Sequence, residues 1–525
     1  MKRKILIFIL IPVFIIWGFN VYDNIQDFEI LKNVEIYVNV LKSIKNNYYT
    51  EVDFRQIITK NIKSLTKELD PYTQYYSDSE IEKTRIDNYN ILYSSGIEID
   101  SFNNKYYISN IIDSSSAFKE NIKIGDELIK IDGFDVLNKK FFEVKQLLFK
   151  QPGYYLTLTI KRNSQIYEKK ILVSNYKPNP IPVSIKINEN VGYIKLTDFT
   201  ENCSVEFRKS FVNLQKSGIK YLIIDLRNNP GGLLNQAVNI INFFIPKDKI
   251  VVVSKGKDEN SIEVFKTNQN PIDENIPIVV LINEKSASAS EIVAGTLQDY
   301  DRAVVVGRNS YGKGLVQRFF DVGYNSMIKI TISKYYLPSG RCIQEINYHN
   351  FDNTSKRQFL TKNKRVVFEG NGILPDIILN NNLEYEFKFL NSIYFFNYCN
   401  ILFSRMLNEN KTTDVFYFDK NEIEIYLKDY LLNTSEELKN LKSIKLKYPD
   451  KTENIDNIIN SLILTDTKSI LKNEDLMKSK IKFELIRREK GNIFMYKTSF
   501  NEDTEIKKAV EILEDNLNYK KILNN

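Results

Sequence analysis

The chain has 525 residues, too many for one compact core, and its length predicts two to four domains. Hydrophobic residues make up 43% of it and aromatic residues 12%, a composition that favours globular folding over disorder. The net charge of +7 is spread thinly over 73 basic and 66 acidic side chains, so nucleic-acid binding is not expected. The three cysteines are odd in number and widely spaced, which excludes a disulfide framework or a cysteine zinc site.

The first 24 residues have the pattern of an export signal or a membrane anchor. Three basic residues at positions 2–4 precede an apolar run over 5–19. No good small-residue cleavage site follows, and the run is just long enough to span a membrane if it extends to Val21. We therefore expect an uncleaved anchor rather than a cleaved signal. The rest of the chain would then lie on the extracytoplasmic side of the cytoplasmic membrane, in the periplasm or envelope.

The next two regions differ in their periodicity. Residues 25–92 repeat apolar side chains at spacings of three and four, which predicts helices ending at a turn at Pro71. Residues 93–175 instead alternate short β-type runs with turn signals, which predicts a mostly-β module with one helix. The expected strands are Ile97–Ile99, Tyr106–Ile111, Leu128–Ile131, Leu156–Ile160 and Tyr167–Val173, and the expected helix is Phe141–Phe149.

Residues 176–380 begin with a proline-spaced linker and then alternate strands with helices, which predicts an α/β core. Its expected strands are Val191–Leu196, Tyr221–Leu226, Ile278–Ile282 and Ala303–Val306, and its expected helices are Val205–Lys216, Leu234–Phe244 and 288–297. Residues 381–525 form a helical extension without a motif. Its helix-like stretches lie around 384–408, 421–443, 453–473 and 504–523.

A serine cluster, Ser286, Ser288 and Ser290, stands where a predicted buried strand leads into a helix. A serine nucleophile needs a base, and the single histidine, His349, lies in a polar insertion, which nearly excludes a histidine-dependent hydrolase. Lys313, 25 residues after Ser288 and flanked by glycines, is the alternative base if burial lowers its pKa.

Two further groups would complete such a site. Gln317, four residues after Lys313, could hold the lysine in place by a hydrogen bond. The amide of Ala289, at a helix start, could stabilise an oxyanion. Taken singly, each residue has a more common structural role, since Ser288 and Glu291 match a helix capping box and a lysine between glycines is usually a solvated loop residue. The catalytic interpretation needs all of them together.

A second group of residues lies in the predicted strand and turn over 222–233. Gly231 and Gly232 would expose backbone N–H groups, although glycines in a strand–turn–helix connection are also common for conformational reasons. That structural explanation leaves Asp225 and Arg227, at the end of an apolar strand, without a purpose. We interpret them as an ion pair that braces an active-site turn.

Several motifs resemble one protein family. DLRNNPGGLL, EKSASASEIVAGTLQD, RAVVVG, YGKGLVQ, SKYYLPSGRCIQ and GILPDI are together similar to the carboxyl-terminal processing (tail-specific) proteases, serine endopeptidases with a Ser–Lys dyad oriented by a glutamine. The resemblance covers roughly residues 30–380 in the family's order. It implies a multidomain α+β protein, in which a PDZ domain precedes an α/β ClpP/crotonase-like ββα protease core, with a helical N-terminal region and a helical C-terminal tail.

The resemblance also assigns roles that the residues alone leave open. It places the nucleophile on Ser288 rather than on Ser286 or Ser290, the base on Lys313 and the orienting residue on Gln317. The oxyanion donors fall on the amides of Ala289 and of either Gly231 or Gly232. The peptide-binding loop of the PDZ domain falls on Ser94, Ser95, Gly96 and Ile97, where the family usually has Gly-hydrophobic-Gly-hydrophobic, so the specificity of this loop is expected to differ.

We therefore expect a serine endoprotease that cleaves exported proteins near their C-terminus through an acyl-enzyme. This interpretation implies no metal or organic cofactor. The partners of the protease would be proteins or peptides with a free C-terminus, bound as an added strand by the PDZ domain. Membrane attachment through the N-terminal segment and homo-oligomerisation are further expectations. One alternative is a catalytically silent, PDZ-bearing scaffold protein of the envelope. A crotonase-like acyl-CoA enzyme is a second alternative, disfavoured by the PDZ-like module and the export signal.

Overall fold

A computed structural model describes residues 27–78, 80–81, 95–174, 176, 179–344, 357–370, 372–379, 388–413, 418–448 and 451–524. The chain divides into two compact units, Met1–Ser77 with Phe320–Lys329 and Asp78–Phe319 with Ile330–Asn525. The expected export segment over 1–24, Ser94 and His349 lie outside the described residues. Within the ranges that are described, no helix is both long enough and apolar enough to cross a membrane.

The first unit is mainly helical. Residues 27–47 form a helix, and α2 (Phe54–Lys67) follows, capped by the Asp53 side chain. The Asp70 carboxylate then accepts the N–H groups of Tyr72 and Thr73, each at 2.8 Å, and turns the chain into β1 (Gln74–Tyr76). β1 pairs antiparallel with residues 327–329 of β16. The predicted helices and the turn at Pro71 are confirmed as far as the region is described.

Residues 97–172 form the predicted mostly-β module. Its strand order is β2-β3-β4-β6-β7, and β5 pairs with β4. The elements are β2 (Ile97–Phe102), β3 (Lys105–Ile111), α5 (Ser116–Lys119), β4 (Glu127–Ile131), β5 (Phe134–Asp135), α6 (Phe141–Leu148), β6 (Tyr155–Arg162) and β7 (Gln165–Leu172). The alternation of buried and exposed residues along β6 shows why its period of two gave the right prediction.

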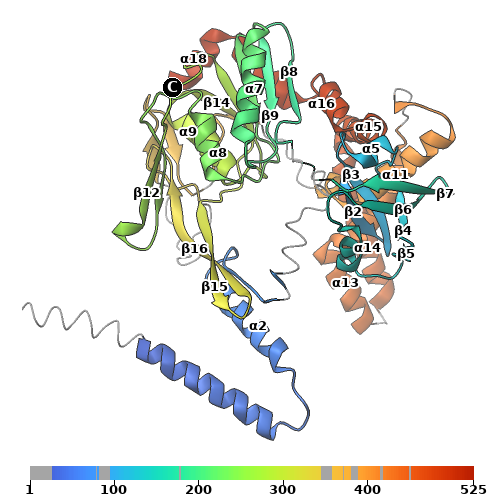
Figure 1. Ribbon diagram of the computed structural model, residues 1–525. Coiled ribbons are helices and arrows are strands. Elements are labelled where there is room, and N and C mark those ends of the chain that lie inside the picture. The colour runs from blue at the N-terminus through green and yellow to red at the C-terminus, as the bar shows by residue number, and fades with distance from the viewer. Residues whose placement is uncertain are drawn as a thin grey trace, which may run out of the picture. The chain divides into compact units, whose positions relative to one another are not determined.

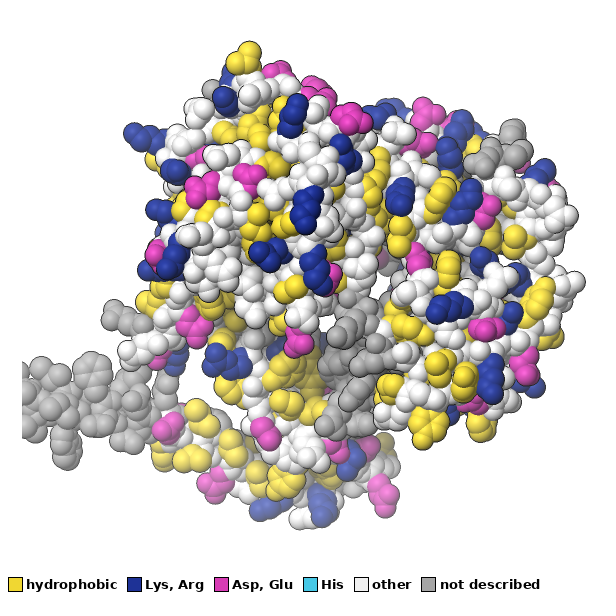
Figure 2. All heavy atoms as spheres, turned by 45° about the horizontal axis from the view of Figure 1, so that its top comes forward, with side chains coloured by type: hydrophobic (Ala, Val, Ile, Leu, Met, Phe, Trp, Pro, Cys, Tyr) yellow, Lys and Arg dark blue, Asp and Glu magenta, His cyan; other side chains and the backbone are white. Residues whose placement is uncertain are grey.

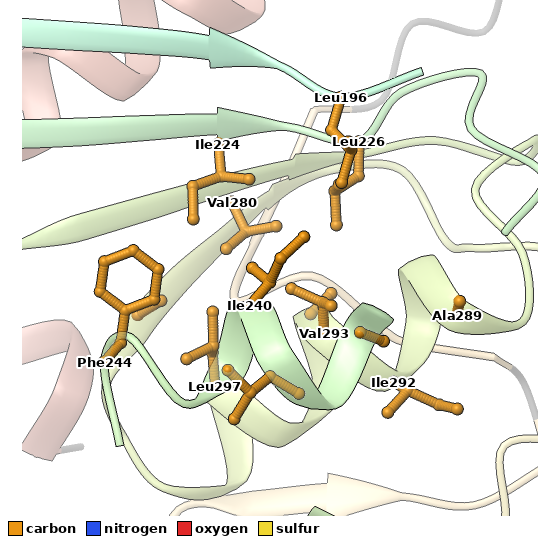
Figure 3. Packing of buried hydrophobic residues seen from close by; sticks show 14 of the residues in the cluster. Leu196, Ile224, Leu226, Ile240, Phe244, Val280, Ala289, Ile292, Val293 and Leu297 are labelled. Carbon is orange, nitrogen blue, oxygen red and sulfur yellow. The ribbon is translucent and has the colours of Figure 1, made fainter. Parts of the chain in front are cut away.

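The core of the second unit is a six-stranded sheet in the order β19-β14-β13-β10-β9-β8, parallel except for β8. Its strands are β8 (Val183–Lys186), β9 (Val191–Lys195), β10 (Tyr221–Asp225), β13 (Ile278–Ile282), β14 (Ala303–Gly307) and β19 (Ile377–Ile378). The helices α7 (Cys203–Lys216), α8 (Leu234–Ile241) and α9 (Ala289–Asp299) pack on one face (Figure 1). In Figure 3, Ile240 of α8 and Val293 of α9 lie against Ile224 and Val280 of the sheet.

The opposite face of this sheet is covered by the end of the chain. α17 (Thr504–Glu514) and α18 (Asn516–Asn524) share a buried cluster with the strands, in which Ile506 and Leu513 join Val279 and Leu281. β13 is buried at every position, and a strand of that kind needs apolar cover on both faces. The helical extension is therefore part of the core's own packing.

A second, antiparallel sheet was not foreseen from the sequence. It contains β11 (Ile250–Lys255), β12 (Ile262–Lys266), β15 (Leu315–Gly323) and β16 (Ser326–Tyr336). α9 lies between β14 and β11, and the hydroxyl of Thr296 donates to the Val251 carbonyl at 2.9 Å. All eleven residues of α9 are consequently buried. The remaining short elements of this part are η1 (Glu259–Ser261), β17 (Gln358–Leu360) and β18 (Val366–Phe368).

The rest of the extension is a helical cluster with its own hydrophobic core. It comprises α11 (Ile393–Asn408), α12 (Lys420–Thr434), α13 (Glu436–Lys447), α14 (Thr452–Ile470), η4 (Leu471–Asn473), α15 (Glu474–Lys490) and α16 (Asn492–Ser499). The helix-like stretch expected around 421–443 is divided into α12 and α13, because Ser435 caps a new helix by accepting the Leu438 N–H. On the face shown in Figure 2, basic and acidic side chains are interspersed, as the thin spread of charge in the sequence suggests.

Candidate active site

Three loops that carry the predicted site residues leave the same edge of the core sheet. β10, β13 and β14 are parallel neighbours, with Asp225 beside Leu281 and Ile282 beside Gly307 at their carboxyl ends. Ligands of open parallel sheets bind outside this edge. The chain places the Gly231-Gly232 turn, the serine cluster and the Lys313 loop there, one after each strand.

The three serines of the cluster differ in burial and in bonding. Ser286 and Ser290 are fully buried, and their hydroxyls donate to the carbonyls of Leu226 at 2.8 Å and Asn229 at 2.9 Å. Ser288 is only partly buried. The two outer serines thus fasten the serine turn to the glycine turn, and Ser288 is the one of the three that is partly exposed.

Ser288 has an unusual backbone conformation, with φ at 54° and ψ at −112°. A non-glycine residue in such a region costs roughly 1–3 kcal/mol and persists only where its surroundings hold it. Gly231 packs directly against it, since a methyl group there would lie 2.6 Å from the Ala287 oxygen and 2.9 Å from the Ala289 nitrogen. Only a glycine lets the two turns approach this closely.

The amides near Ser288 differ in their availability. Ala289 is the first residue of α9, where a backbone N–H has no acceptor within the helix. The N–H of Gly231 donates to the Asn229 side chain at 2.9 Å, whereas the N–H of Gly232 has no acceptor among the residues that the structure describes. Of the two glycines that the sequence left open, Gly232 is therefore the one whose N–H is available to a ligand.

The buried carboxylate of Glu291 joins the serine turn to the Lys313 loop. One oxygen accepts the N–H groups of Ser288 at 2.7 Å and Lys313 at 2.9 Å, and the other accepts the Gly312 N–H at 2.7 Å and the Ser310 hydroxyl at 2.5 Å. Burial raises the pKa of Glu291 from 4.5 to about 6, although these hydrogen bonds oppose the rise. The sequence offered Glu291 only as half of a capping box and missed this second role.

The glycines around Lys313 have separate structural reasons. Gly312 has a φ of 82°, which lies in the left-handed region. Gly314 lies against the backbone of Gln344, where a methyl group would come within 2.7 Å of the Gln344 nitrogen. The Gln344 side chain also accepts the Gly314 N–H at 2.8 Å. Lys313 is half-buried, and the glycines on both sides of it are held by hydrogen bonds from their N–H groups.

Gln317 lies on β15, and its side-chain nitrogen donates to the Thr331 hydroxyl of β16 at 3.3 Å. This bond fixes the side-chain amide of Gln317, which lies on the strand that begins two residues after Lys313. Thr331 was not foreseen, because only the pairing of β15 with β16 brings it opposite Gln317. The orienting role of Gln317 stays a prediction.

Asp225 and Arg227 do form the expected pair, in a larger buried ion cluster. The Asp225 carboxylate accepts hydrogen bonds from three groups. These are Arg227 at 2.6 Å, Lys195 at 3.0 Å and the Tyr193 hydroxyl at 2.7 Å. Burial by itself would raise the pKa of Asp225, but Arg227 and Lys195 hold it well below its ordinary value. Burial lowers the pKa of Lys195, an effect that Asp225 partly offsets. The cluster braces the start of the glycine turn.

The later family-like motifs support α9 from its far end. Arg341 is fully buried, 2.8 Å from Asp299, and also donates to Gln298 at 2.8 Å. Asp376, from GILPDI, accepts hydrogen bonds from Gln298 and from the Val305 N–H. Because Ser288 and Glu291 begin this helix, the network holds the serine turn indirectly.

The predicted peptide-binding loop of the β module is described from Ser95 onward. Ser95 is fully buried, and its hydroxyl accepts the Ile97 N–H at 3.3 Å. Gly96 has a φ of 79°, and a methyl group there would come within 2.4 Å of Ser115 Cβ. The Gly96 carbonyl accepts the Ile112 N–H at 3.0 Å. Gly96 is therefore required by both conformation and space, although the loop sequence departs from the usual pattern.

Comparisons with known proteins agree with this architecture. Residues 190–349 match the profile of peptidase family S41, and residues 95–173 match that of the PDZ domain. A carboxy-terminal-processing protease of Bartonella bacilliformis is 30% identical over 68% of this chain and 77% of its own length. A probable CtpA-like serine protease of Staphylococcus haemolyticus is 33% identical over 58% of this chain. The match spans 61% of that relative's length.

Among solved structures, the photosystem II D1 C-terminal processing protease is similar over 65% of this chain and 89% of its own, with 23% identity and a TM-score of 0.39. The family assignment therefore rests on the sequence matches and not on this structural similarity. On the strength of those matches, the chain belongs to the carboxyl-terminal processing proteases of peptidase family S41, with a PDZ domain before the peptidase domain. The predicted fold class is confirmed.

Proposed function

We propose that this protein is an active serine endoprotease that processes the C-terminal region of exported proteins through a Ser288–Lys313 dyad. The observation that carries the proposal is the shared Glu291 oxygen, which accepts the backbone N–H groups of both residues and so ties the nucleophile to the loop of the base. The partial exposure of Ser288 beside two buried serines supports it as the attacking residue.

The chemistry would follow the acyl-enzyme route. Ser288 Oγ bonds to the scissile carbonyl carbon as its proton passes to Lys313 Nζ, and Gln317 holds the lysine. The N–H groups of Ala289 and Gly232 stabilise the oxyanion. The C–N bond then breaks, and the leaving amine takes the proton from Lys313. Water attacks the acyl-enzyme, gives a proton to Lys313 and releases the acid, after which the proton returns to Ser288.

The PDZ domain would bind the substrate's C-terminal tail. An extended peptide adds to a sheet edge while loop amides hold its carboxylate, and β2 is the edge strand beside the Ser95-Gly96-Ile97 loop. The proposal extends to the location: the basic and apolar N-terminal segment would export the chain and anchor it to the membrane, on the extracytoplasmic side. Self-association of the N-terminal helices or the tail belongs to the same proposal.

A cleavage assay on a peptide with an apolar free C-terminus tests the catalytic part. Ser288→Ala and Lys313→Ala should both abolish cleavage and leave the fold intact. Lys285→Ala is the matched control, since Lys285 is an exposed lysine three residues before Ser288. Full activity in Lys313→Ala would exclude the dyad. If the unaltered protein binds the peptide without cleaving it, the silent scaffold alternative is correct.

A further inference from the structure

Glu505, near the start of α17, bridges the roots of two active-site loops. One of its oxygens accepts a hydrogen bond from Arg227 at 2.5 Å, and the other accepts one from Arg308 at 2.8 Å. Arg227 directly precedes the Asn228–Gly232 turn, and Arg308 opens the loop that leads to Lys313. A single carboxylate from the helical extension therefore holds the loop of the oxyanion donor and the loop of the base.

The surroundings make this bridge rigid. The side chains of Glu505, Arg227 and Arg308 are only 8%, 14% and 19% exposed, so water weakens their pairing little. Arg227 is also held by Asp225 and by Asp503, whose carboxylate caps α17 by accepting the Glu505 and Ile506 N–H groups. All five groups lie on the wall of a cavity of about 870 Å³ between the strand ends and the helical extension. Arg308 is also held by Glu284, to which it donates a hydrogen bond at 2.9 Å.

Glu291 joins the Lys313 loop to the serine turn, whereas Glu505 joins the root of the Lys313 loop to the root of the glycine turn. Glu291 fixes the backbones of Ser288 and Lys313, but the Gly232 turn reaches that carboxylate only through the serine turn. The distance between the oxyanion donor and the base then depends on the separation of Arg227 and Arg308. Misplacement of catalytic groups by about 1 Å can lower a rate roughly 100-fold.

We propose that Glu505 is a positioning residue of the peptidase site, acting through Arg227 and Arg308 to set the oxyanion turn against the Lys313 loop. The helical extension, for which the sequence offered no role, thereby becomes a required part of the active enzyme. This inference rests on the proposed Ser288–Lys313 site.

The test is steady-state cleavage of the same peptide by Glu505→Gln in the full-length chain. A glutamine has nearly the same shape as glutamate but only one acceptor oxygen. Its NH₂ group would face the second arginine, so one of the two hydrogen bonds is lost. Glu511→Gln is the matched control, because Glu511 lies on the same helix, is 63% exposed and pairs only with Lys508 among the described residues. We expect kcat to fall between about tenfold and 100-fold with KM unchanged, since tail binding by the PDZ domain is untouched.

Three further measurements separate positioning from folding. Labelling of Ser288 by a fluorophosphonate should slow in parallel with kcat, while the thermal unfolding midpoint stays near that of Glu511→Gln. Arg308→Gln should lower kcat as well, and the double variant Glu505→Gln/Arg308→Gln should be no worse than the more severe single one. If Glu505→Gln does not fold, Arg308→Gln, which removes the Arg308 arm of the bridge together with the Arg308–Glu284 ion pair, carries the same expectation.

Normal kcat in folded Glu505→Gln or in Arg308→Gln overturns the inference. So does a loss of activity that matches the loss of folded protein. Ser288→Ala in the same assay keeps the two proposals apart: if it is inactive and Glu505→Gln is normal, only the positioning role fails, whereas an active Ser288→Ala refutes the dyad itself.

Discussion

Ser288 and Lys313 donate their backbone N–H groups to the same oxygen of Glu291, at 2.7 and 2.9 Å. A buried carboxylate in this position fixes the spacing of the two residues through the backbone, which the proposed dyad requires. The capping-box pattern and the catalytic pattern, which the sequence presents as alternatives, are therefore parts of one arrangement.

Glu291 should make activity depend on pH near 6. Below the Glu291 pKa of about 6, one carboxylate oxygen carries a proton. A protonated oxygen accepts the surrounding N–H groups less well, so the Lys313 loop is held less firmly. The ratio of wild-type to Glu291→Gln kcat/KM should be large above pH 7 and fall toward one by pH 5. A ratio that is constant over this range would contradict the role given to the carboxylate.

Stability should change in the opposite sense over the same range. Because the pKa is raised from 4.5 to about 6 on folding, the folded chain binds more protons between these values, and the free energy of unfolding falls as pH rises through them. The shift corresponds to about 2 kcal/mol. Urea unfolding of wild type against Glu291→Gln should show wild type gaining relative stability from pH 7 to pH 4.5. A constant difference would be inconsistent with the raised pKa.

Gly231→Ala should strongly reduce activity by forcing the glycine turn away from Ser288. The added methyl group would lie 2.6 Å from the Ala287 oxygen, so one of the two turns must move. Gly218→Ala is the control, since Gly218 also has a positive φ, 84°, but no atom within 4 Å of the added methyl group. We expect a loss of about 100-fold in kcat for the first variant and little for the second. Equal activities would show that the close approach is unimportant.

Gly96→Ala tests the peptide-binding loop. Its methyl group would come within 2.4 Å of Ser115 Cβ, whereas Gly133→Ala, at a similar φ of 83°, meets nothing within 4 Å. For a peptide with a free C-terminal carboxylate, KM should rise for Gly96→Ala and stay normal for Gly133→Ala. An amidated peptide should erase the difference. The same KM for both variants on the free-carboxylate peptide would remove the loop from substrate recognition.

Arg341→Met should destabilise the core. The change leaves Asp299, which is 1% exposed, without its cation, and removal of one partner of a buried pair costs about 3–5 kcal/mol. The urea midpoint followed by circular dichroism should fall clearly. The double variant Arg341→Met/Asp299→Asn, which removes both charges, should recover part of the loss. An unchanged midpoint in the single variant would mean that the pair contributes little.

The local patterns predicted five strands and the main helix of the PDZ domain, and four strands and three helices of the parallel core, but missed the short elements α5, β5, β8 and β19. They did not predict the antiparallel sheet, whose partners β11 and β16 lie far apart in sequence. They also gave no role to the end of the chain, although the fully apolar β13 run required cover on both faces and so was a signal that a second layer existed.

The site divides in the same way. The serine cluster, Lys313 and the glycine turn could be proposed from residue type and spacing, whereas the choice of Ser288 among the three serines came from the family resemblance. Glu291 was visible only as a cap, since its bonds to Ser310 and Gly312 cross between loops. Glu505 could not be found at all, because its arginine partners lie about 200 residues or more away.

The most direct test of the central claim is labelling with a fluorophosphonate followed by mass spectrometry of the digested protein. The hydroxyls of Ser286 and Ser290 are buried and engaged, and Ser288 alone of the three is partly exposed. We predict a single adduct on Ser288, lost in Lys313→Ala and retained in Lys285→Ala. An adduct on Ser286 or Ser290, or undiminished labelling of Ser288 in Lys313→Ala, would contradict the Ser288–Lys313 mechanism.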